Sequence, residues 1–181
     1  MLVFNTEIHI VTFLILLLEL VFFCYQIVHY FSRPSDKNRL YYLILLSFLI
    51  LHNFVGGLFP DKKIPIPIIT QNIIAYAVPA VMSMYFPFYF YKAFNLTKLK
   101  FYAYGGSVLF ILVPFILFFI VPYYLTNNLE LSKDLVLIIP SIYAVSFVYS
   151  LNRAIKIKNK ENKERSQTEI IGNPVVSSVP R

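Results

Sequence analysis

Charged residues are scarce in this chain of 181 residues: they make up 14% of it, against 58% hydrophobic residues, and the mean hydropathy is +0.67. A soluble domain needs about 25% charged residues to cover its surface and averages about 45–50% apolar residues. The composition therefore excludes most classes of water-soluble protein, because so much apolar surface has to meet lipid.

Cysteine, glycine and the motifs of catalysis are also lacking. The single cysteine, Cys24, permits no intramolecular disulfide and gives no sign of a stapled extracellular fold. The sequence contains no His-x-x-x-His or Cys-x-x-Cys metal spacing, no Gly-x-Ser-x-Gly nucleophile turn and no glycine loop for phosphate. We therefore predict no catalytic residue, no metal ligand and no cofactor. Five glycines are also few for a transporter built on broken helices.

Five long apolar runs are present instead, at residues 8–31, 40–59, 67–91, 101–125 and 135–151. Crossing about 30 Å of hydrocarbon takes roughly 17–25 apolar residues in a helix, so each run is long enough, the last one barely. The polar connections between the runs are short, which favours antiparallel neighbours. We predict an all-α fold: a polytopic integral membrane bundle of five transmembrane helices, followed by a basic, disordered tail at residues 152–181.

The positive charges predict the orientation of the bundle. Of the 16 lysines and arginines, thirteen fall in alternate connections or in the tail, and the exceptions are Lys62, Lys63 and Lys133. Cytoplasmic segments of membrane proteins are enriched in Lys and Arg. The asymmetry therefore predicts an outside N-terminus and an inside C-terminus (N-out, C-in). The net charge of +7 thus indicates membrane orientation and not direct nucleic-acid binding.

A dense basic segment follows the last apolar run. We expect it to bind anionic lipid, at about 1 kcal/mol for each near-surface cation, or only to keep the C-terminus inside. Its cations are Arg153, Lys156, Lys158, Lys160, Lys163 and Arg165.

A carboxylate, Glu19, lies near the middle of the first apolar run. An acidic residue at the centre of a membrane helix costs about 2.5–3.5 kcal/mol, so we expect Glu19 to face protein. Antiparallel pairing through a short connection places His52 at the same depth, with Asn53 next to it. A Glu–His pair in a low dielectric can share one proton or ionise together, and so respond to pH. The alternative is that Glu19 only hydrogen-bonds a neighbouring helix and fixes packing.

Two amides, Gln71 and Asn72, lie at the start of the third run, at the depth of Gly56 and Gly57 in the second. Together with the polar pair of the second run they outline an outward-facing cavity for a ligand, because small residues leave room there. The alternative is that the two glycines end the second helix and that the amides cap backbone groups.

Four distinctive strings occur in and around the second and third runs: residues 53–61 (NFVGGLFPD), 64–66 (IPI), 71–76 (QNIIAY) and 85–94 (YFPFYFYKAF). They resemble the multi-span N-terminal membrane region of bacterial signalling proteins. The resemblance implies about seven helices in the bacterial cytoplasmic (inner) membrane, followed by a cytosolic histidine kinase or helix-turn-helix output domain. This chain differs from that pattern, because it has five apolar runs and too few residues after Arg165 for either output domain.

These features together predict an integral membrane sensor or signalling module without its own catalytic domain. It would be a truncated receptor, or would recruit a signalling partner or assemble as a homo-oligomer. A ligand or a proton would act near the five polar residues and shift helices that are kinked at their prolines. The alternatives are a small transporter or accessory subunit, with Glu19 as a proton-coupling carboxylate, and a purely structural membrane subunit. The predicted sensing residues are Glu19, His52, Asn53, Gln71 and Asn72.

Overall fold

The computed structural model describes residues 8–172, and side chains from residue 8 to residue 167. Within that range the elements are all helical, and five helices are long and apolar enough to cross a membrane. The all-α class and the five candidate spans expected from the apolar runs are confirmed. The chain therefore has the fold of a multi-pass membrane protein.

The first three helices are α1 (Ile10–Ser32), α2 (Lys37–Leu58) and α3 (Ile68–Ala93). Polar side chains cap the first two. His9 Nδ1 accepts a hydrogen bond from the Val11 amide, and Asp36 Oδ1 accepts one from the Arg39 amide. Because the capped start of α2 follows so soon after the end of α1, the two helices run antiparallel and begin and end at matching depths.

The fourth span, Thr97–Thr126, is continuous but not uniformly α-helical. Most of its middle has π-type turns, which are one residue wider than α-turns and change which side chains face the neighbouring helices. Pro122 lies in the first turn of the α-helical end, directly after the π-type turns. The parts are η1 (Thr97–Leu99), η2 (Tyr102–Gly106), η3 (Val108–Leu112), η4 (Phe115–Ile120) and α4 (Val121–Thr126).

The last helix, α5 (Leu129–Gly172), has 44 residues and continues well past the apolar run at 135–151. This corrects the expected disordered tail, because residues 152–172 are helical. Lysine, arginine and glutamate are good helix formers, and Lys160 and Glu164 lie 3.7 Å apart as an i,i+4 pair. The remaining residues of the predicted tail, 173–181, lie outside the described part of the chain.

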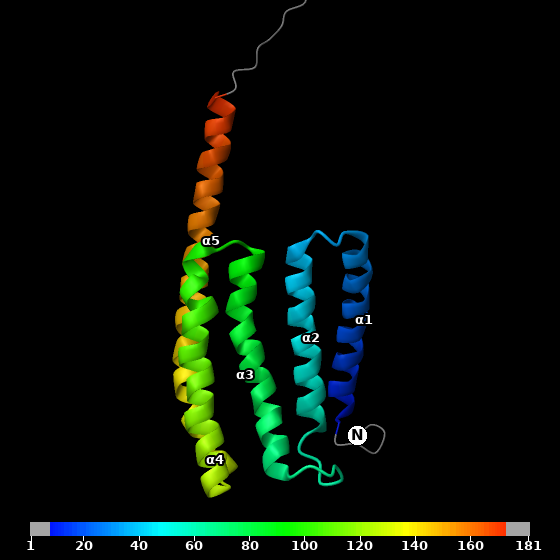
Figure 1. Cartoon of the computed structure of the whole chain (residues 1–181). Helices are drawn as coiled ribbons and strands as arrows, with labels where there is room; N and C mark the ends of the chain where they lie inside the picture. Colours follow the sequence, from blue (N-terminus) through cyan, green and yellow to red (C-terminus); the bar gives the residue numbers. More distant parts are fainter. Residues whose placement is uncertain (1–7, 173–181) are drawn as a thin grey trace, which may run out of the picture.

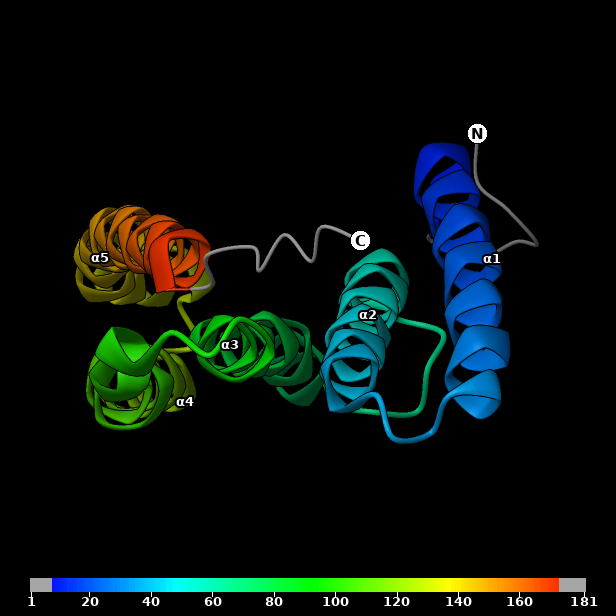
Figure 2. The same cartoon turned by 90° about the horizontal axis from the view of Figure 1, so that it is seen from above.

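The helices α1, α2 and α3 form an open row, and α3, the fourth span and α5 form a triangle at one end of that row (Figure 2). Seen along the bundle, α1, α2 and α3 follow one another, and the fourth span and α5 lie beside α3 (Figure 2). α1 packs chiefly against α2, while α3 packs against both α2 and the fourth span. The outer side chains of α1 are apolar and open: Leu14 is 59% exposed and Val28 65% exposed. Such surfaces fit lipid contact in a chain this apolar.

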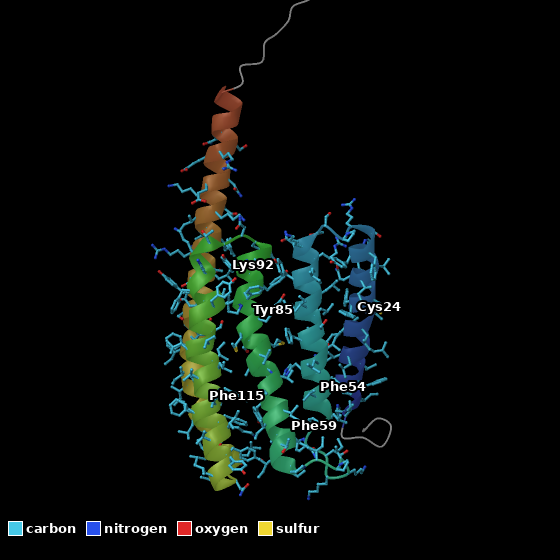
Figure 3. All side chains as sticks on the ribbon, in the orientation of Figure 1. Cys24, Phe54, Phe59, Tyr85, Lys92 and Phe115 are labelled. Atoms are coloured by element: carbon cyan, nitrogen blue, oxygen red, sulfur yellow. The ribbon has the colours of Figure 1, made fainter. Side chains whose placement is uncertain are left out.

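The bundle has two chemically different ends (Figure 1). One end has the α1–α2 connection, the α3–η1 connection and the part of α5 that projects beyond the other helices; we call it the basic end. The opposite end has the α2–α3 loop and the α4–α5 turn. Lys92 lies toward the basic end and Phe59 toward the opposite end in Figure 3. In the described part of the chain, every Lys and Arg belongs to segments of the basic end except Lys62, Lys63 and Lys133.

Candidate functional site

A buried carboxylate pairs α1 with α2. Glu19 is only 8% exposed, and its Oε1 accepts a hydrogen bond from Asn53 Nδ2 at 2.5 Å. The short connection predicts that Glu19 lies opposite His52, and the structure puts both residues at this level. The direct hydrogen bond, however, is made by the next residue, Asn53. Depth follows from the connection, whereas the rotation of α2 about its axis decides which of two neighbours faces α1.

His52 completes this group, which we call the Glu19 cluster (Glu19, His52 and Asn53). His52 lies close enough to interact electrostatically with the Glu19 carboxylate. Within the described part of the chain, Glu19 Oε2 and His52 Nδ1 are both buried without a hydrogen-bond partner. Leaving a buried polar atom unpaired costs about 1–3 kcal/mol, so two such atoms in one cluster are unusual for a purely structural contact.

Gln71 does not join the Glu19 cluster but holds the α2–α3 loop. Its side chain is fully buried, and its Oε1 accepts a hydrogen bond from the Asp61 amide at 2.7 Å. Its Nε2 donates to the carbonyl of Asp61 at 2.9 Å and to that of Ile66 at 2.8 Å. The amide is thus bonded to backbone at both its oxygen and its nitrogen, which matches the alternative that these amides satisfy backbone groups.

Asn72 contacts a different neighbour again. Its Nδ2 donates to the Tyr123 hydroxyl at 2.7 Å, and the two side chains are 5% and 3% exposed. This bond joins α3 to α4, at the side of α3 away from α2. The structure therefore brings together Glu19, His52 and Asn53, while Gln71 and Asn72 bond to the loop and to α4.

Gly56 and Gly57 have separate environments. A Cβ on Gly57 would lie 3.0 Å from Thr12 Cγ2 on α1, whereas a Cβ on Gly56 would meet nothing within 4 Å. Gly57 therefore allows the close approach of α1 and α2 in the half of the pair that leads to the opposite end. The helix continues through both glycines to Leu58, one residue beyond the end expected from the glycine pair.

A second polar group, which we call the tyrosine–serine cluster, was not among the predicted sites. Ser107 and Tyr143 in it are buried, and Tyr102 and Ser150 are half-buried. It consists of Tyr102, Ser107, Tyr143 and Ser150, and it joins the fourth span to α5. The Tyr143 hydroxyl donates to the Tyr102 carbonyl at 2.7 Å and lies 3.0 Å from Ser107 Oγ. Ser107 Oγ also donates to the Tyr102 carbonyl at 2.6 Å, and Ser150 Oγ donates to the Tyr102 hydroxyl at 2.9 Å.

The tyrosine–serine cluster depends on a glycine. A Cβ on Gly106 would lie 3.0 Å from the Tyr143 ring and 3.2 Å from the Phe101 carbonyl, so the ring of Tyr143 occupies the space that a side chain would need. The only sequence signal was the Gly-Gly-Ser string at residues 105–107 inside an apolar run, since small and hydroxyl residues mark close helix contacts in membranes.

Comparison with protein family models, with curated proteins and with solved structures finds no match to this chain. The likeness of the strings at residues 53–94 to bacterial signalling proteins therefore stays a prediction. Among the described residues, no group of three or more His, Cys, Asp or Glu side chains could hold a metal ion. The carboxylate and the imidazole of the Glu19 cluster can exchange protons and form hydrogen bonds.

Proposed function

We propose that this protein is a membrane sensor or signalling module, without a catalytic domain of its own, in which the Glu19 cluster takes up a proton or a small polar ligand. The observation that carries the proposal is the pair of buried, unpartnered atoms, Glu19 Oε2 and His52 Nδ1. An ionisable residue inside a membrane span is expensive and is commonly retained for function.

One added proton would change the bonding of this cluster. A carboxylate oxygen accepts hydrogen bonds, and the unprotonated nitrogen of a neutral imidazole also accepts. As long as neither atom carries a proton, neither can donate to the other. A single proton on Glu19 Oε2 or on His52 Nδ1 supplies the missing donor, and a ligand with an N–H or O–H group can do the same.

The change would be felt where α1 meets α2. α1 packs chiefly against α2. Two contacts fix the position of α1 on α2: the Glu19–Asn53 hydrogen bond and the close approach of Thr12 to Gly57. A shift of α1 on α2 would move their connection at the basic end. A signalling partner or a second copy of the chain at that end would read the movement.

The charge distribution supports an N-out, C-in orientation for this proposal, because nearly all the described cations belong to the basic end and cytoplasmic segments are rich in Lys and Arg. A bacterial cytoplasmic membrane follows from the sequence resemblance alone. Signals would then enter from the side of the N-terminus and be read in the cytoplasm.

The same carboxylate supports a second candidate, a small transporter or accessory subunit in which Glu19 couples solute movement to protons. The open Oε2 in the middle of a span favours it, since proton relays use such groups. Proton-driven solute uptake into vesicles that is lost in Glu19→Gln would decide for transport. A sensor would show no uptake in either protein.

The experiment for sensing labels one introduced cysteine, which is simple here because only one native cysteine, Cys24, has to be removed. In a Cys24→Ser background, Ser35 in the α1–α2 connection is replaced by cysteine, and its maleimide labelling in vesicles is followed from about pH 5 to pH 8, where histidine titrates. At each pH the labelling rate is divided by that of a small free thiol, because maleimide reacts with the thiolate and every cysteine labels faster as the pH rises. We expect this ratio to depend on pH in the parent and to become flat in Glu19→Gln and in His52→Ala. Glu130→Gln, an exposed acidic change at the far end of the bundle, is the control and should keep the pH dependence. Equal pH profiles in Glu19→Gln and the parent would contradict the proposal.

A further inference from the structure

A polar cavity lies between the α3–η1 connection and the projecting part of α5. Both segments belong to the basic end (Figure 1). Its volume is about 460 Å³, within the range of roughly 300–1,000 Å³ that ligand pockets occupy. One wall comes from residues 95–98, and the other comes from one face of α5 between Ala154 and Arg165. The cavity is separate from the Glu19 cluster, which lies between α1 and α2.

The wall formed by residues 95–98 is held by the way α3 ends. Asn95 adopts a left-handed conformation with φ of 49°. Its amide donates to the Lys92 carbonyl at 3.4 Å, and the Leu96 amide donates to the Tyr91 carbonyl at 3.1 Å. These two bonds form a Schellman motif, in which asparagine replaces the usual glycine. The chain direction after α3 is therefore fixed by backbone bonds.

The two walls are also held to each other. Leu96 and Ala154 are 4% and 5% exposed and belong to one apolar cluster with Leu99 and Phe147. Lys158 Nζ donates a hydrogen bond to the Phe94 carbonyl at the end of α3. The cavity thus has an apolar floor that is formed by packing and does not depend on the charged side chains at its rim.

Positive charge dominates the rim. Lys98 from η1 and Lys158 and Arg165 from α5 line the cavity, together with a single acidic residue, Glu161. Asn95, Thr97 and Asn162 add uncharged polar groups. Three cations from two segments, with one opposing carboxylate, favour an anion, and arginine and lysine are the usual ligands of phosphate.

The height of the cavity favours a lipid as the source of that anion. The apolar run of α5 ends near Leu151, and at 1.5 Å per residue Ala154 and Lys158 lie roughly 5–10 Å beyond it. The headgroup layer on each side of a bilayer is about 5–7 Å thick. Tyr91 and Tyr102, which pack on the same apolar cluster, are residues of the type that gathers at membrane interfaces. The floor of the cavity is therefore at headgroup depth.

We propose that this cavity binds the phosphate-bearing headgroup of one anionic lipid, with Lys98 and Lys158 as its ligands from opposite walls. The bound lipid would bridge the α3–η1 connection and α5 and set the angle at which α5 leaves the membrane. Basic residues outside the cavity, such as Lys100 and Lys163, contribute only general attraction to an anionic surface. The proposal does not rest on sensing at the Glu19 cluster, and either can fail without the other.

Native mass spectrometry of the detergent-purified full chain tests the site, because a micelle lacks the surface potential of an anionic bilayer. The probes are phosphatidylglycerol and phosphatidylcholine, added separately. We expect one phosphatidylglycerol to be retained in preference to phosphatidylcholine. At about 1 kcal/mol per contacting cation, Lys98→Gln and Lys158→Gln should each weaken retention about 5-fold. Glu161→Gln, which removes the opposing carboxylate, should strengthen it, and a merely misfolded variant would not do so.

Matched controls separate a site from a diffuse patch. Lys100→Gln and Lys163→Gln remove the same charge from residues that do not line the cavity, and Glu130→Gln removes an acid at the far end of the bundle; all three should leave retention unchanged. Equal losses in Lys98→Gln and Lys100→Gln, or equal retention of the two lipids, would overturn the proposal. Competition by inorganic phosphate at concentrations similar to those of the lipid would assign the cavity to a soluble anion and would also overturn it.

Discussion

The Glu19 cluster and the tyrosine–serine cluster are both polar groups at contacts between membrane helices, yet their bonding differs. In the tyrosine–serine cluster, the hydroxyls of Tyr102, Ser107, Tyr143 and Ser150 are all bonded to one another or to backbone. In the Glu19 cluster, one carboxylate oxygen is bonded and the other is not, and the imidazole nitrogen facing the interior is also open.

This difference suggests different roles: the tyrosine–serine cluster stabilises the fold, whereas the Glu19 cluster can still bind a proton or a ligand. A fully bonded cluster gains nothing from a further proton or ligand, and removing one of its members leaves others unpaired. A cluster with two unpartnered polar atoms gains bonds when a proton or a ligand that pairs with them arrives. Proteins commonly give up stability at such sites, so the two clusters should respond to mutation with opposite signs.

The largest effect is expected at the glycine that admits the Tyr143 ring. In Gly106→Ala the new methyl group would press on the Tyr143 ring and the Phe101 carbonyl, and overpacking of this kind costs about 1–3 kcal/mol. Gly105→Ala is the matched control, because its methyl group would lie 3.7 Å from the Phe101 ring, an ordinary contact. SDS-induced unfolding in mixed micelles, followed by circular dichroism, should show Gly106→Ala as the less stable variant. Equal stability would mean that the ring can move aside freely.

A smaller loss is expected from Tyr143→Phe, which removes a hydroxyl that bonds the Tyr102 carbonyl and Ser107. Hydrogen bonds between membrane helices are worth about 0.6 kcal/mol on average and at most about 1.7, so the loss should be about 1 kcal/mol. Tyr149→Phe, at a side chain that is 69% exposed, is the control and should change little in the same titration. A neutral Tyr143→Phe would show that the cluster is not a source of stability.

The smallest and opposite change is expected from Glu19→Gln. Glutamine keeps an oxygen for Asn53 and puts an N–H donor in place of the open Oε2, while removing a charge from the interior. We expect a gain of up to about 1 kcal/mol in the unfolding free energy, together with loss of the pH response described above. Asn53→Ala, which leaves both carboxylate oxygens open, should lower stability in the same assay. Destabilisation by Glu19→Gln would place Glu19 among the purely structural contacts.

The membrane fold could be predicted because its cause is compositional. Runs of about twenty apolar residues must be buried in lipid as helices, and their number follows from counting them. The meeting of Glu19 with residues 52 and 53 could also be predicted, since a short connection fixes the relative depth of antiparallel helices. The choice of Asn53 as the bonding partner depends on helix rotation, which the connection does not determine.

Other features of the structure depend on contacts between distant segments, which the sequence of a single segment does not show. Gln71 bonds to Asp61 and Ile66 because the α2–α3 loop folds back over it, and a loop path is not encoded in hydrophobic periodicity. The tyrosine–serine cluster joins residues about forty positions apart through wide π-type turns that rotate Ser107 inward. The helix at residues 152–172 does not follow from charge content, because lysine, arginine and glutamate are abundant in disordered segments and are also strong helix formers.

The continuity of α5 gives small motions in the membrane a long reach. From Asn152 to Gly172 the helix continues for roughly 30 Å beyond its apolar part, without an internal proline in that stretch. A stiff rod converts angle into distance, so a tilt of about 10° at the membrane surface would carry the far tip sideways by roughly 5 Å. A partner that docks near residue 172 would therefore gain or lose its contact with α5 when the helix tilts by a small angle at the membrane surface.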